Sequence, residues 1–94
     1  MHLRRVVGNS MAPTLVADQI IVISGRSRRL REGDVVVVVR SDREMVKRIH
    51  IVDAAKGVFV LGDNANESTD SRSFGWLDHS EITGRVIWPR TKNK

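Results

Sequence analysis

The apolar residues of this chain fall in short runs rich in valine and isoleucine, and turn-forming residues separate the runs. The longest run, residues 35–39, has the length of one strand. No segment of about 12 residues or more repeats its apolar positions at the period of an amphipathic helix. This spacing favours an all-β fold, a small coiled, mostly antiparallel sheet or barrel. We expect strands at residues 4–7, 19–24, 34–40, 45–52, 58–61 and 84–88, and short helical turns at residues 10–15 and 78–82.

Size and composition fit one domain, residues 1–94, with a basic tail at residues 90–94. Hydrophobic residues make up 40% of the chain, which excludes a disordered protein. There is no cysteine, hence no disulfide frame and no thiolate metal site, and this suits a reducing compartment. No run reaches the ~20 apolar residues of a membrane helix. We therefore expect a cytoplasmic protein, the alternative being membrane association through a partner or a removed anchor.

The net charge of +5 permits binding to nucleic acid, to an acidic partner or to an anionic membrane surface. Basic residues cluster at residues 26–31 and in the tail, where a solvated loop and a polar end are the simplest reading. Aromatic residues make up only 4%, too few for base-stacking platforms. We therefore expect no nucleic-acid partner. Peripheral membrane contact and the oligomeric state are left open.

Lys47 has an unusual place in the strand expected at residues 45–52. Side chains alternate between the two faces of a strand, so Lys47 shares its face with Met45, Ile49 and Ile51. A lysine there either snorkels, with its ammonium in water, or loses hydration, which lowers its pKa. A lysine of lowered pKa can act as a general base. The strand by itself favours snorkelling.

Ser10 follows a Gly-Asn pair and precedes a turn that contains Pro13, at the point where the first strand pattern ends. An exposed hydroxyl there, next to free backbone N–H groups, would suit acyl transfer with an oxyanion hole. A turn or helix cap is the structural alternative. The polar loop at residues 62–75 is long for a small domain, and such loops are usually functional or disordered. Its polar side chains can hold it in shape by hydrogen bonds to one another.

Four motifs, taken together, resemble the type I signal peptidases. They are Ser-Met-x-Pro-Thr-Leu at residues 10–15, Gly-Asp-Val-Val-Val at 33–37, Val-Lys-Arg-Ile at 46–49, and Gly-Asp-Asn at 62–64 followed by Ser68, Asp70-Ser71-Arg72 and Gly75. They occur in the family's order and span residues 6–89, nearly the whole chain. The resemblance implies the family's catalytic-core fold and the activity of a serine endopeptidase.

The resemblance also implies residue roles. Ser10 would be the nucleophile, with its main-chain N–H as an oxyanion donor, and neutral Lys47 the general base. Ser68 would orient the lysine amine. The residues expected to brace the loop are Asp63, Asn64, Asp70, Ser71, Arg72 and Arg48. Such a Ser/Lys dyad needs no metal and no organic cofactor.

The chain departs from the family pattern at several places. Gly8 stands where some members carry a hydroxyl residue, so the second oxyanion donor is unassigned. Ala17-Asp18 replaces the usual Gly-Asp, and the Gly-x-Pro-Gly-Asp run and the large insertion are missing after Arg48. The compact form is similar to the maturation proteases of nickel-type superoxide dismutase. This resemblance implies a protein precursor with an N-terminal propeptide as substrate.

Three other functions compete with that reading. A general leader peptidase working beside a membrane is the nearest alternative. A self-cleaving repressor-type peptidase domain uses a related Ser/Lys pair. A non-catalytic basic β-barrel that binds nucleic acid would place Lys47 at the surface with other cations rather than on an apolar face.

Overall fold

The computed structural model describes residues 1–25 and 29–91, and it is all-β, as the sequence predicts. Its strands are β1 (His2–Arg5), β2 (Ile20–Ser24), β3 (Val35–Arg40), β4 (Arg43–Asp53), β5 (Gly57–Leu61) and β6 (Ile82–Trp88). Each predicted strand is present, and no end moves by more than two residues. Part of the basic run at residues 26–31 and most of the basic tail lie outside the described residues.

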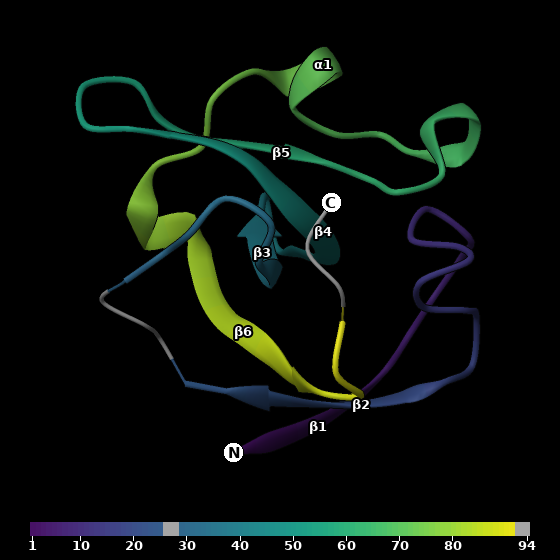
Figure 1. Ribbon diagram of the computed structural model, residues 1–94. Helices are drawn as coiled ribbons and strands as arrows, with labels where there is room; N and C mark the ends of the chain where they lie inside the picture. Colours follow the sequence, from purple (N-terminus) through teal and green to yellow (C-terminus); the bar gives the residue numbers. More distant parts are fainter. Residues whose placement is uncertain (26–28, 92–94) are drawn as a thin grey trace.

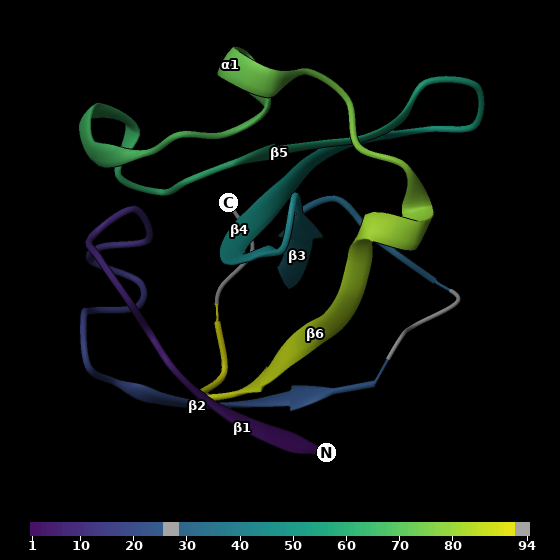
Figure 2. The same cartoon turned by 180° about the vertical axis from the view of Figure 1, so that it is seen from behind.

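The six strands form one antiparallel sheet in the order β1-β2-β6-β3-β4-β5. The sheet curls, so that β1 and β2 lie on one side of the molecule and β4 and β5 on the other, with β6 and β3 between them (Figures 1 and 2). The segment that connects β1 to β2 lies beside the loop that follows β5. This arrangement brings the Ser10 turn and the polar loop together.

The unbroken valine run of β3 follows from its place in the middle of the sheet. Val35 and Val37 belong to one hydrophobic cluster, whereas Val36 and Val38 belong to the other, on the opposite face. A strand buried on both faces reads as a continuous apolar run rather than an alternating one. The two clusters together form the core of the molecule.

One prediction for β4 is wrong. Lys47 and Ile49 are buried, as their shared face requires, but Ile51 is 37% exposed. The pairing of β4 with β5 shifts register between Ile49 and Ile51, so His50 is an extra residue in the ladder. A bulge of this kind reverses the alternation of side chains beyond it. The predicted apolar face therefore ends at Ile49.

Short helical pieces occupy the connections. Residues 10–15 form hydrogen-bonded turns without a helix, and they bury Met11 and Leu15 in the core. The second predicted turn holds the 3-10 helix η2 (His79–Glu81). The polar loop contains the 3-10 helix η1 (Ala65–Glu67) and one turn of helix, α1 (Ser71–Phe74). Across the described residues, no helix has both the length and the apolar character needed to span a membrane.

Candidate active site

Ser10 and Lys47 line the same pocket, although they lie 37 positions apart in the sequence. The pocket has a volume of about 410 Å³. Two backbone segments form its walls, residues 4–11 on one side and residues 43–47 on the other, and Glu67 and Thr69 close it from the polar loop. Ser10 is half-buried at the end of its turn. The two catalytic candidates make no direct hydrogen bond within the part of the chain that the structure describes.

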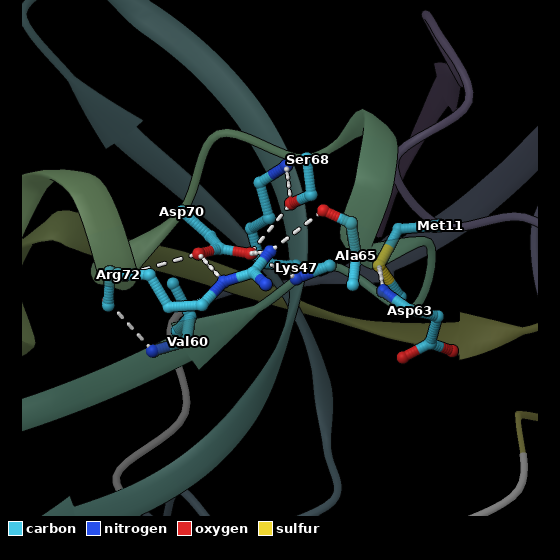
Figure 3. Close-up of polar contacts among 10 residues, drawn as sticks. Met11, Lys47, Val60, Asp63, Ala65, Ser68, Asp70 and Arg72 are labelled. Atoms are coloured by element: carbon cyan, nitrogen blue, oxygen red, sulfur yellow. Dashed lines mark hydrogen bonds and ion pairs between the residues drawn. The ribbon is translucent and has the colours of Figure 1, made fainter.

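Lys47 is buried, with 4% of its surface exposed, so its amine is not held out in water. This burial lowers the pKa of Lys47. The negative charge of Asp70 opposes the shift, and the positive charges of Arg43 and Arg72 reinforce it. The Nζ atom donates a hydrogen bond of 3.3 Å to Ser68 Oγ (Figure 3). The hydrogen bond therefore holds the Lys47 amine, whose pKa is lowered, at a fixed place in the pocket.

Asp70 organises the hydrogen bonds behind Lys47. Its carboxylate is fully buried and accepts from Ser68 Oγ at 2.8 Å, from the Gly62 N–H at 2.9 Å, and from the backbone and guanidinium of Arg72 (Figure 3). Burial alone would raise the pKa of Asp70, but these hydrogen bonds outweigh it and hold the pKa well below its usual range. Asp70 is therefore ionised and can only accept.

The ionised state of Asp70 fixes the direction of the two hydrogen bonds that link Asp70, Ser68 and Lys47. Because the Ser68 hydroxyl donates its hydrogen bond to Asp70, Ser68 Oγ can only accept from Lys47. The lysine must therefore turn an N–H toward Ser68. In the neutral amine, the single lone pair is left free to accept a proton from another donor.

A buried ion pair supports the Ser10 turn. Arg48 binds Asp63 with two hydrogen bonds of 2.8 and 2.9 Å, and the two side chains are 7% and 4% exposed. Arg48 also donates to the Gly33 carbonyl, and Asp63 accepts from the Thr14 hydroxyl. The pair thus ties the turn at residues 10–15 to the sheet.

Other members of the predicted bracing set also join the loop to its surroundings. The backbone N–H of Asn64 donates to the Ser10 carbonyl at 2.8 Å, and its side-chain amide donates to the Asn9 carbonyl at 3.1 Å. Ser71 Oγ accepts from the Val60 N–H in β5 at 2.9 Å. The structure therefore brings every predicted site residue into one connected region.

Sequence reasoning assigned no role to Gly62, yet it packs at the centre of the site. A Cβ atom at this position would lie 2.1 Å from Ser68 Oγ and 2.6 Å from the Ser10 carbonyl oxygen. Only a residue without a side chain lets the two segments approach this closely. Gly62 opens the Gly-Asp-Asn motif, but a close contact between the polar loop and the distant Ser10 turn cannot be read from local sequence patterns.

The three histidines lie apart from this arrangement. His2, His50 and His79 are exposed, and none of them lines the pocket that Ser10 and Lys47 share. Among residues 1–25 and 29–91, no group of three His, Asp or Glu side chains is placed to hold a metal ion. Beside Ser10, the pocket offers its hydroxyl, the amine of Lys47 and backbone N–H groups.

A comparison with known protein families assigns the chain to a family. Residues 2–87 match the family described as Peptidase S24-like. The match covers most of the chain, and the protein belongs to the Peptidase S24-like family. Membership supports a serine-peptidase type of function. A comparison with curated proteins gave no match.

Proposed function

We propose that the protein is a serine endopeptidase with a Ser10/Lys47 dyad, which removes an N-terminal propeptide or leader from a protein precursor. The observation that carries the proposal is Lys47 itself. Its amine is buried, of lowered pKa, and oriented by Ser68 in the pocket that it shares with Ser10. A general base needs both a suitable pKa and a fixed position.

In the proposed reaction, Ser10 Oγ attacks the scissile carbonyl while the lone pair of Lys47 takes the hydroxyl proton. The C–N bond then breaks, and Lys47 returns the proton to the leaving amine. In deacylation, Lys47 takes a proton from a water molecule as the water oxygen attacks the acyl-enzyme carbonyl. The ester C–O bond then breaks, and Lys47 returns the proton to Ser10 Oγ. Dyad hydrogen bonds that are absent in a free enzyme commonly form when substrate binds.

The backbone at Ser10 offers the oxyanion donors. Neither the Ser10 N–H nor the Asn9 N–H has a hydrogen-bond partner in the described part of the chain, and both residues line the pocket. We assign the first donor to Ser10 and the second, which the sequence left open at Gly8, to Asn9. Two N–H groups aimed at a developing oxyanion stabilise the transition state of acyl transfer.

The substrate would bind as an added strand. β1 pairs with β2 alone among the described strands, so its other edge is free. β4 pairs with β5 only from Arg48 onward, so residues 43–47 are also unpaired on that side. These two edges form the walls of the pocket. An extended peptide between the two edges would form hydrogen bonds with their free backbone N–H and C=O groups, as peptides do when they add a strand to a sheet edge.

For the substrate, we propose the precursor of a nickel-type superoxide dismutase, processed in the cytoplasm. Support comes from the four sequence motifs and from the compact chain, since the connection between β4 and β5 is only a short turn. A general leader peptidase acting beside a membrane is the second candidate, because the same dyad would serve it.

A cleavage assay tests both the proposed dyad and the proposed substrate. The native protein should trim a nickel-type superoxide dismutase precursor, and Ser10→Ala and Lys47→Ala should each abolish the reaction. Ser73→Ala and Lys56→Ala, which change exposed residues outside the pocket, are the matched controls and should retain activity. If the protein cleaves a signal-peptide precursor but not the superoxide dismutase precursor, the proposed dyad stands and the proposed substrate is wrong.

Two outcomes would overturn the dyad. Cleavage that survives in Ser10→Ala or Lys47→Ala would show that another group acts as nucleophile or base. Incubation of the native protein without substrate, followed by mass spectrometry, covers the self-cleaving alternative. Cleavage only within its own chain would favour that alternative over a precursor protease.

A further inference from the structure

An ion pair crosses the pocket at the end away from Ser10. Arg4 Nε in β1 lies 2.8 Å from Glu44 Oε1 in β4, and the two side chains are 41% and 39% exposed. Both residues line the pocket, one from each wall. Because β1 and β4 are not neighbours in the sheet, the pair joins the two edges between which a substrate strand would lie.

Positive charge is in excess around this pair. Arg43 precedes Glu44 in the same wall, and its side chain has no hydrogen-bond or ion-pair partner within residues 1–25 and 29–91. Arg5 follows Arg4 in β1, and its guanidinium donates to a backbone carbonyl, that of Asp18. Three arginines, Arg4, Arg5 and Arg43, and one acid, Glu44, therefore line this end of the pocket. The other acid of the lining, Glu67, lies on the loop side and accepts from Asn64.

The two ends of the pocket differ in character. Near Ser10 the inward side chains are apolar and include Val6, Met11 and Val46, whereas Arg4 and Glu44 occupy the far end. Glu44 precedes Lys47 by three residues, and a strand advances about 3.3 Å per residue. A peptide lying beside β4 would therefore present its third or fourth residue from the scissile bond to the charged end.

We propose that this charged end selects an acidic side chain of the substrate, three or four residues from the scissile bond, and that Arg4 and Arg43 bind it. The inference rests on the proposed function. An exposed ion pair such as Arg4–Glu44 is weak, worth about 1 kcal/mol or less. An incoming carboxylate can therefore share Arg4 without a large cost, while it gives Arg43 a partner.

The test uses labelled peptides that span the cleaved junctions of the two precursors above. Each peptide carries Glu, Gln or Lys at one position, three or four residues to either side of the scissile bond. Binding to the Ser10→Ala protein is measured by fluorescence anisotropy, and kcat/KM is measured with the native protein. Binding needs no catalysis, so the two readouts separate this inference from the proposed function.

We expect tighter binding of the Glu peptide at one of these positions, and a preference that weakens in high salt, since exposed charges are screened there. Arg4→Gln and Arg43→Gln, each added to Ser10→Ala, should reduce the preference for Glu over Gln by about two- to fivefold. Glu44→Gln should increase it. Arg85→Gln, which removes an equal charge outside the pocket, should leave it unchanged.

Equal binding of the Glu, Gln and Lys peptides at all positions would overturn the inference, and so would a preference that survives in both arginine variants. Failure of every peptide to bind would overturn it as well. If the Ser10→Ala protein prefers the Glu peptide but the native protein cuts nothing, the acidic selectivity stands and the proposed protease activity falls.

Discussion

Arg72 acts on Lys47 without touching it. Its guanidinium holds the carboxylate of Asp70, which is the anion that would otherwise stabilise a protonated lysine, and its own positive charge lowers the pKa of Lys47 further. The side chain is partly exposed, whereas Asp70 is fully buried. The surface residue therefore adjusts the charge state of the buried amine.

The pH dependence of cleavage reports this effect. Lys47 must be neutral to act, so activity rises with pH through its pKa. Arg72→Gln removes a charge that lowers this pKa and leaves Asp70 less neutralised, so the pKa should rise and the acidic limb of kcat/KM should move to higher pH. Arg72→Lys should restore much of the native limb. If Arg72→Gln lowers the maximum of kcat/KM but does not move its acidic limb, Arg72 has only a structural role.

At the scale of elements, Gly62 sets the distance between the polar loop and the Ser10 turn. Gly62→Ala should push apart Ser68 and the Ser10 carbonyl, because the added Cβ has no room beside either. We expect a loss of about 1–3 kcal/mol in the free energy of unfolding, typical of overpacking, together with a large loss of kcat. Urea denaturation and the cleavage assay measure the two effects.

Gly25→Ala is the matched control, since a Cβ at that position meets no atom within 4 Å. Stability and activity should both stay near native in this variant. A Gly62→Ala protein with native activity would contradict the assigned role of the close contact.

The Arg48–Asp63 pair makes a second prediction at this scale. Asp63→Leu leaves a buried guanidinium without its partner, which should cost about 3–5 kcal/mol of stability. Arg48→Met with Asp63→Leu removes both charges and should recover much of that loss. A double-mutant cycle by denaturant unfolding checks this. Simple addition of the two single losses would show that the side chains act independently.

The elements differ in how far the sequence predicts them. The valine run predicts β3 because a central strand is apolar on both faces. The apolar neighbours of Lys47 by themselves favour a snorkelling lysine, and only the family resemblance points to the buried amine that the structure has. The bulge at His50 escapes prediction, since no glycine or other marker accompanies it and only the pairing with β5 requires it. The hydrogen bond between Lys47 and Ser68 was expected only from the family resemblance. The need for glycine at position 62 comes from contacts between segments far apart in the sequence, and local sequence patterns do not show such contacts.

For the whole molecule, the curled sheet leaves a gap between β1 and the first half of β4. If a substrate strand fills this gap, it binds the folded state alone and should raise the melting temperature. Peptide at a hundred times its Kd should add about 2.7 kcal/mol to the free energy of unfolding. Thermal unfolding of the Ser10→Ala protein with and without peptide measures this.

Proline replacements in the peptide provide the control. A proline in the central part lacks the N–H that a strand needs, so this peptide should shift the melting temperature much less. Equal shifts with both peptides would contradict binding as a strand and would place the peptide elsewhere on the surface.

Free strand edges do not distinguish a precursor from its cut fragments. A fragment that stays extended after cleavage can remain in the gap or return to it, so product inhibition should slow the reaction as fragments accumulate. If the new N-terminus folds into the product's own domain after cleavage, the product is no longer extended and cannot bind in the gap again. The open sheet thus favours substrates for which processing is coupled to folding, and unstructured peptides should show turnover that declines early.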